Sequence, residues 1–202
     1  MKTRIIAVAA LAACSVCATS NAEMLGEAHV YGSHIKLDDG AGFQPSGNGF
    51  GARAKLPLPL TGLFASAEYQ RNNTSGSGTD LKITSGRVGV GDEISLGVVS
   101  AQLRGEYVHL RGETSGGSDN DDGFGVHAGV DAGIGVAGVY GSVGYLKLAD
   151  DKGPELMAGA RFSIFPLLSL FGELRHSKLK DSTGGGGELT VNDYHVGVRF
   201  SF

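Results

Sequence analysis

Apolar residues recur at every second position through much of this chain, and the alternation with polar residues runs to the last residue. In the final segment Tyr194, Val196, Val198, Phe200 and Phe202 alternate with polar residues or glycine. Because successive side chains of a strand point to opposite faces, this pattern predicts a strand between two different environments. The alternation recurs in seven other segments, at 50–56, 65–70, 102–107, 124–131, 139–145, 158–164 and 170–175.

Two weaker segments, 27–37 and 82–91, complete a predicted set of ten strands of about ten residues, the length that a tilted membrane-crossing strand needs. We therefore predict an all-β fold, a closed antiparallel up-and-down transmembrane β-barrel of ten strands, with eight as the alternative count. Long polar connections alternate with short ones, which places both termini on the side of the short turns. The long set is 38–48, 72–80, 112–122, 149–154 and 180–187, and the short set is 57–62, 91–95, 133–135 and 165–168.

The glycine content argues against a helical fold. The chain has 202 residues, of which 34 are glycine and none is tryptophan. Each glycine inside a helix costs about 0.5–1 kcal/mol relative to alanine, whereas glycine suits the bends and close strand contacts of a barrel wall. Beyond the N-terminal segment, no apolar run approaches the roughly 18 residues expected of a membrane helix.

The aromatic residues favour a wall that faces lipid. Six of them sit on the apolar face where strands meet the long connections, which predicts an interfacial girdle: Tyr69, Tyr107, Tyr145, Phe50, Phe124 and Tyr194. A soluble β protein, whose core would receive the apolar face, stays open as the alternative.

The opposite face carries nearly balanced charges, which predicts a polar, paired barrel interior with pairs such as Glu68 with Arg87. Its acids are Glu27, Glu68, Glu106, Asp131, Glu173 and Asp193, and its bases are Arg53, Lys55, Arg87, Arg104, Arg161, Arg175 and Arg199.

The first 22 residues resemble a signal peptide, since Lys2 and Arg4 precede an apolar run and small residues follow up to Ala22. We expect cleavage after Ala22, so that residues 1–22 are removed and residues 23–202 form the barrel domain. Lipidation of Cys14 is the alternative, because residues 11–14 resemble a lipobox. The mature chain would carry 17 − 2 = 15 basic and 21 acidic residues, a balance of 15 − 21 = −6, and no basic stripe that would favour nucleic acid.

Over its mature length the chain resembles the small bacterial outer-membrane barrels, the OmpA transmembrane-domain and OmpX-like group, most specifically in the strand 194–202 that ends in Phe202. The resemblance implies a location in the outer membrane of a Gram-negative cell, among outer-membrane lipid and lipopolysaccharide. It also implies that the barrel-assembly machinery recognises the last strand through Phe202. Ten strands would depart from the eight that are usual in this group.

Few residues suggest chemistry. His127 and Asp131 share the polar face, and His109 lies near the acidic stretch Asp119-Asn120-Asp121-Asp122, which could attract a divalent cation. The glycines at 89–91 and 184–187 lack the context of a phosphate loop. We expect no catalytic, cofactor-binding or metal site and no enzyme activity.

The expected function is a structural or surface-interaction role, in adhesion or envelope integrity, through extracellular loops with an unknown surface ligand. A narrow pore is the second candidate, because a barrel this small leaves little room inside. An enzyme with its site at the rim is the third.

Overall fold

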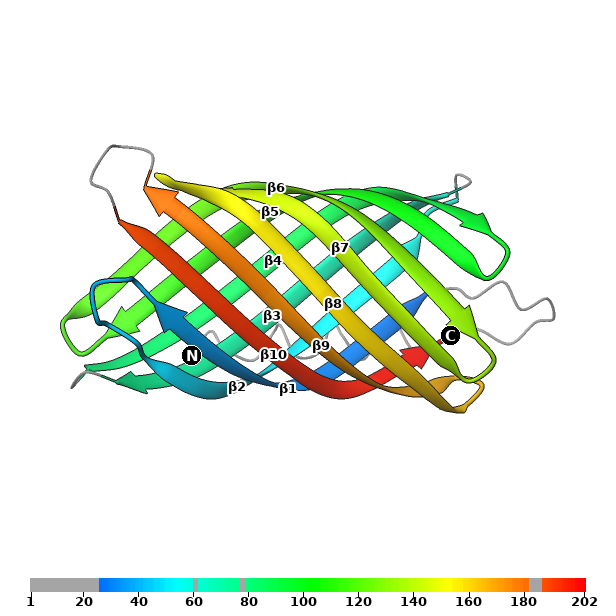
Figure 1. Cartoon of the computed structure of the whole chain (residues 1–202), viewed down its shortest axis with the longest axis horizontal. Helices are drawn as coiled ribbons and strands as arrows, with labels where there is room; N and C mark the ends of the chain where they lie inside the picture. Colours follow the sequence, from blue (N-terminus) through cyan, green and yellow to red (C-terminus); the bar gives the residue numbers. More distant parts are fainter. Residues whose placement is uncertain (1–25, 60–61, 77–78, 182–186) are drawn as a thin grey trace, which may run out of the picture.

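The computed structural model describes residues 26–59, 62–76, 79–181 and 187–202, so the predicted signal peptide, Cys14 and Ala22 lie outside the described part. The described residues form ten strands and no helix long and apolar enough to cross a membrane (Figure 1). The strands are β1 (Glu27–Asp38), β2 (Ser46–Pro57), β3 (Leu63–Gly76), β4 (Thr79–Leu96), β5 (Val99–Thr114), β6 (Gly117–Ile134), β7 (Ala137–Leu148), β8 (Asp151–Phe165), β9 (Leu168–Asp181) and β10 (Glu188–Ser201).

Each strand pairs antiparallel with the next along the chain, and β1 pairs with β10 to close the barrel. The backbone groups of Gly26 and Phe202 exchange two hydrogen bonds of 2.9 and 3.0 Å at this seam. The prediction of a closed antiparallel barrel with ten strands is confirmed, and the alternative count of eight is wrong.

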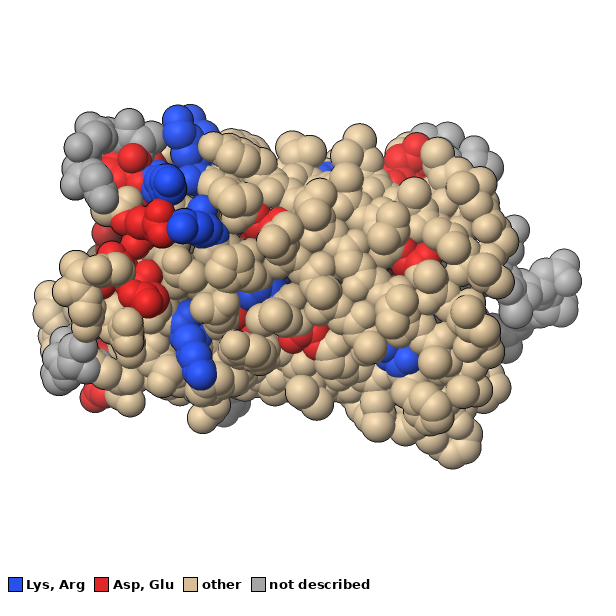
Figure 2. Space-filling view, in the orientation of Figure 1, with Lys and Arg blue, Asp and Glu red and all other residues tan. Residues whose placement is uncertain are grey.

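The apolar residues of the alternation point outward, as a wall in lipid requires. Along β6 the outward side chains from Phe124 to Ile134 are apolar or alanine, a stretch matching the roughly 9–11 residues of a tilted membrane strand. All six predicted girdle aromatics are exposed on this outer wall, and the rings of Tyr107 and Phe124 meet edge to face at 5.5 Å. Figure 2 shows the charged residues gathered near the end that carries the β9–β10 connection, with few over the rest of the wall.

We call this end the distal end, and the opposite end, where Phe202 lies, the terminal end (Figure 1). Of the five long connections predicted at the distal end, 38–48 and 180–187 fall between strands for most of their length, whereas the other three are much shorter than predicted. Most of 112–122 belongs to a β5–β6 hairpin that turns at residues 115–116, and most of 72–80 lies in β3 and β4. Polar composition suggested loops, but backbone pairing continues through polar residues once neighbouring strands are in register. The hairpins therefore project beyond the apolar band.

One predicted short turn is also wrong. Residues 91–95 lie inside β4, and the chain turns at Gly97 and Val98 instead. Gly97 has φ +73°, a left-handed conformation that suits glycine, so the turn falls where this residue stands.

Glycines at inward positions make room for rings inside the barrel. A Cβ atom at Gly51 would lie 2.4 Å from Cζ of Tyr31, and one at Gly144 would lie 2.1 Å from Nδ1 of His127. Part of the high glycine content therefore comes from large side chains that cross the narrow interior.

Candidate functional site in the barrel interior

The interior has three levels along the barrel axis. A polar cavity opens towards the terminal end, a layer of ion pairs occupies the middle, and a mainly apolar cavity lies in the distal half. The two cavities have volumes of about 240 Å³ each. The middle layer lies between them, and its side chains are buried.

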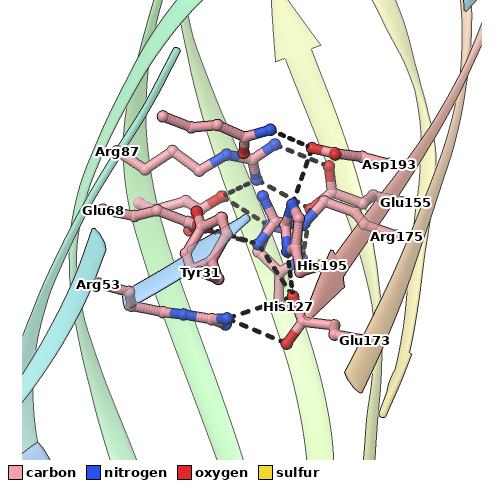
Figure 3. Close-up of polar contacts among 12 residues, drawn as sticks. Tyr31, Arg53, Glu68, Arg87, His127, Glu155, Glu173, Arg175, Asp193 and His195 are labelled. Carbon is pink, nitrogen blue, oxygen red and sulfur yellow. Dashed lines mark hydrogen bonds and ion pairs between the residues drawn. The ribbon is translucent and has the colours of Figure 1, made fainter. Parts of the chain in front are cut away.

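Arg175 on β9 is the centre of the ion-pair layer (Figure 3). Its guanidinium lies 3.0 Å from Glu68 on β3, 3.7 Å from Glu173 and 4.0 Å from Glu155 on β8. All four side chains are at least nine-tenths buried. A buried charge is tolerated only when it is paired and hydrogen-bonded. These four side chains meet that condition by reaching one another across the lumen.

Arg87 on β4 forms the second centre of the layer. Its guanidinium lies 2.7 Å from Glu106 on β5 and binds both oxygens of Glu155, at 2.9 and 3.0 Å. The predicted pair of Glu68 with Arg87 is therefore wrong, although the two residues face each other in the β3–β4 register. Glu68 turns to Arg175 instead, because long side chains in a narrow barrel reach across the lumen as easily as to the next strand.

His195 and Tyr31 fill the remaining space of the layer. Nδ1 of His195 lies 3.1 Å from Glu173, and its Nε2 lies 3.0 Å from Asp193. The Tyr31 hydroxyl donates a 2.6 Å hydrogen bond to Glu68, and the Tyr31 ring packs against the His195 ring at 4.3 Å. Gln70 donates a 2.6 Å hydrogen bond to Asp193. These contacts join β1, β3, β9 and β10 across the middle of the barrel.

The cavity at the terminal end is lined by further charged residues, some of which pair with one another and some with acids of the ion-pair layer. Arg199 lies 2.6 Å from Glu27, Arg161 binds Asp131, and Lys55 binds Glu93. Arg53 reaches from β2 to Glu173 at 3.1 Å, and Arg104 lies 3.2 Å from Glu106. The prediction of a paired, charged interior is confirmed for the middle and terminal levels.

The distal level contradicts that prediction. Its lining is mainly apolar, with a buried cluster of Val108, Leu146, Leu148 and Leu179, although polar residues such as Asn72 and Ser177 also face this level. The alternation changes phase here: Leu146 and Leu148 point inward while Lys147 between them is exposed. The phase change is present in the run Tyr145-Leu146-Lys147-Leu148, so the prediction of one continuous apolar face along this strand is wrong at its distal end.

The residues considered for catalysis are not brought together. His127 lies in the ion-pair layer, 3.1 Å from Glu106, whereas Asp131 lies in the terminal cavity with Arg161. His109 does meet Asp122, with Nδ1 2.7 Å from its carboxylate, and Tyr107 donates a 2.5 Å hydrogen bond to the same oxygen. This group lies on the exposed outer wall beside the girdle, outside the lumen.

The acidic stretch in β6 does not converge on one ion. Asp119 and Asp121 alternate with Asn120 and Asp122 along the strand, so the two sets point to opposite faces of the wall. Gly89 and Gly91 are interior positions of β4 rather than parts of a phosphate loop, and residues 184–186 lie outside the described part.

Three buried residues could surround a metal ion, although no motif in the sequence groups them. Ligand atoms of Glu106, His127 and Glu155 all lie within 4.8 Å of one another. The Arg87 guanidinium already contacts the carboxylates of Glu106 and Glu155. Its positive charge therefore compensates their negative charges without a metal ion. The cluster is therefore explained as part of the ion-pair layer. Glu155 itself was missed because Pro154 beside it suggested a loop.

No protein-family model matches the chain, and no curated protein matches it. Among solved structures it resembles Neisserial surface protein A, with a TM-score of 0.52 and 14% identity over 88% of this chain and 97% of that one. It resembles the outer membrane protease OmpT from Escherichia coli with a TM-score of 0.54 and 9% identity, over 88% and 95%. The β domain of the Bordetella autotransporter BrkA gives 0.53 and 12%, over 88% and 100%.

At these identities the likeness shows the fold alone. The chain has the fold of the bacterial outer-membrane β-barrels, and within that fold its interior is closed by the ion-pair layer.

Proposed function

We propose that the protein resides in the bacterial outer membrane as a closed barrel and acts at the cell surface, in adhesion or envelope integrity, through its distal end. The observation that carries this proposal is the contrast between the two parts of the barrel. The middle is closed by buried ion pairs, whereas the distal hairpins project charged side chains beyond the apolar wall (Figure 2). Such hairpins offer a polar surface to partners outside the cell.

The proposed orientation places the terminal end in the periplasm and the distal end outside, as in other outer-membrane barrels. The proposed partners are outer-membrane lipid and lipopolysaccharide around the wall, and the barrel-assembly machinery at the last strand. Membership in the OmpA and OmpX-like group is part of the proposal, supported by the last strand. The proposal assigns no catalytic step, and it gives the His109–Asp122 pair the role of supporting Tyr107 at the girdle.

Shortening the β5–β6 hairpin tests the surface role. Removal of residues 113, 114, 117 and 118 deletes two facing pairs and keeps the turn, so the register of the remaining strands is preserved. We expect normal barrel levels and a severalfold loss of cell adhesion or serum survival. The matched control removes 95, 96, 99 and 100 from the β4–β5 hairpin at the terminal end. Equal behaviour of the two deletion strains and the parent would contradict the surface role.

A narrow pore is the second candidate, because a polar cavity leads from the terminal end to the ion-pair layer. We expect the intact protein to give no stable single-channel steps in planar bilayers, since Arg175 and its partners fill the path. The double variant Glu68→Gly/Arg175→Gly removes one acid and one base, so the net charge of the lumen does not change while both side chains leave the path. We expect this variant to conduct. Large, stable currents from the unaltered protein would favour the pore over the surface role.

A further inference from the structure

Three lysines lie side by side on the outer wall of the distal end, on the neighbouring strands β7, β8 and β9. Lys147 is directly opposite Lys152 in the β7–β8 ladder, and Lys152 is directly opposite Lys180 in the β8–β9 ladder. All three side chains are exposed, and Figure 2 shows basic side chains gathered at this end of the barrel. We call these three residues the lysine row. Since neighbouring strands are about 4.8 Å apart, the row places three positive charges on one small area of the wall.

Basic residues on the outer wall of β4 and β5 are arranged differently, because they share an acid. Lys82 is opposite Glu113 in the ladder and lies 2.6 Å from it, and Arg111 lies 2.9 Å from the same carboxylate. Like charges directly opposite each other on one face destabilise a ladder, whereas opposite charges stabilise it. The lysine row departs from this rule over three strands in succession.

The lysine row is only partly neutralised by acidic side chains of the described residues. Lys180 lies 3.7 Å from Glu188, which is nearer to Lys178 at 2.7 Å. Lys147 and Lys152 form no ion pair with any residue in the part of the chain that the structure describes. The row is therefore suited to an anion supplied from outside the chain.

The lysine row borders the apolar wall that faces lipid. Tyr145 of the aromatic girdle lies two residues before Lys147 on the same face, a distance of about 7 Å along the strand. Two residues further from the row, Val143 and Leu156 are directly opposite each other and exposed on the wall. The same two strands therefore present apolar side chains, an interfacial tyrosine and two lysines in succession. A lipid with acyl chains and a negatively charged head group matches this order.

We propose that the lysine row binds the phosphate groups of a lipopolysaccharide molecule in the outward-facing leaflet, with the acyl chains along Val143 and Leu156. The inference rests on the proposed orientation of the barrel, which places the distal end outside, and it assigns one site to the lipid partner proposed there. Phosphate oxygens accept charge-assisted hydrogen bonds, so one phosphate group can bind two neighbouring ammonium groups. An acidic protein is a poorer match, because a lipid brings its charged and apolar parts to the same short stretch of wall.

Native mass spectrometry of the folded, purified barrel in dodecyl maltoside micelles tests the proposal. The barrel is titrated with diphosphoryl lipid A, which is the acylated and phosphorylated part of lipopolysaccharide, with monophosphoryl lipid A and with phosphatidylcholine. We expect saturable binding of diphosphoryl lipid A, weaker binding of the monophosphoryl form and no saturable binding of phosphatidylcholine. Equal affinities for all three lipids would overturn the recognition of phosphate. Displacement of lipid A by an equal concentration of inorganic phosphate would overturn the assignment to a lipid.

This measurement is independent of the proposed surface role. It uses no cells, and the lysine row lies on β7, β8 and β9, whereas shortening of the β5–β6 hairpin tests adhesion. Specific binding of lipid A by a protein whose hairpin deletion leaves adhesion unchanged would uphold the row and reject the surface role. Loss of adhesion in the deletion strain without specific binding of lipid A would do the reverse.

Variants with matched changes of charge locate the site. The variant Lys147→Gln/Lys152→Gln/Lys180→Gln is expected to weaken binding of diphosphoryl lipid A about tenfold or more, whereas arginine at the same three positions should keep the affinity within about twofold. The control Lys36→Gln/Lys82→Gln/Arg111→Gln removes three positive charges from the outer wall of β1, β4 and β5, and we expect a change of less than about twofold. Heat-modifiable gel mobility verifies that each variant is folded. Equal weakening in the two glutamine variants, or unchanged binding in the row variant, would contradict the site.

Discussion

Replacing Arg87 with alanine is expected to lower the free energy of unfolding by about 3–5 kcal/mol. The substitution removes the cation that binds Glu106 at 2.7 Å and Glu155 at 2.9 Å, and both carboxylates are more than nine-tenths buried. Neither acid can turn to water, because the barrel wall and the rest of the layer surround them. Urea-induced unfolding in lipid vesicles measures the change.

Two further variants make this experiment specific. Arg111→Ala removes an arginine of the outer wall whose partner is Glu113 at 2.9 Å, and we expect a loss of less than about 1 kcal/mol because both side chains are substantially exposed. Arg87→Lys keeps the charge but cannot bind both oxygens of Glu155 in the same planar geometry, so its stability should fall between the parent and Arg87→Ala. Equal losses in Arg87→Ala and Arg111→Ala would show that the layer does not stabilise the barrel.

Deleting Phe202 is expected to lower the amount of barrel in the outer membrane severalfold and to increase its degradation in the periplasm. Chain ends usually tolerate change, but here Phe202 exchanges two backbone hydrogen bonds with Gly26 where the last strand meets the first. Its ring is also the feature that, by resemblance, the assembly machinery would recognise. Fractionation of cells at native expression, with heat-modifiable gel mobility as the measure of folding, checks the result.

Substitutions by serine separate assembly from stability. Phe202→Ser keeps the backbone hydrogen bonds and removes only the ring, and we expect it to behave like the deletion. Phe162→Ser makes the same chemical change on the lipid-facing wall of β8, where the side chain is exposed, and should assemble close to the parent level. Normal assembly of the Phe202 deletion would refute recognition of the terminal ring.

The fold, and the face of the wall on which most residues lie, can be predicted from the local pattern of residues. Period-two alternation decides locally which side chains share a face, so the ten strands, the outward aromatics such as Tyr107 and the inward charges such as Arg175 could be predicted without any long-range information. The ends of the strands could not be predicted well, since pairing continues through the polar residues of the β5–β6 hairpin.

The contacts between interior residues depend on how the closed barrel brings distant strands together. Glu68 and Arg87 are neighbours in the ladder, yet Glu68 pairs with Arg175 from the opposite side of the lumen, because closure and strand tilt bring β3 and β9 within reach of each other. The apolar cavity has the same origin. Leu110 on β5 and Leu179 on β9 look like ordinary members of alternating strands, and they line one cavity only because the closed barrel turns both inward at the same level.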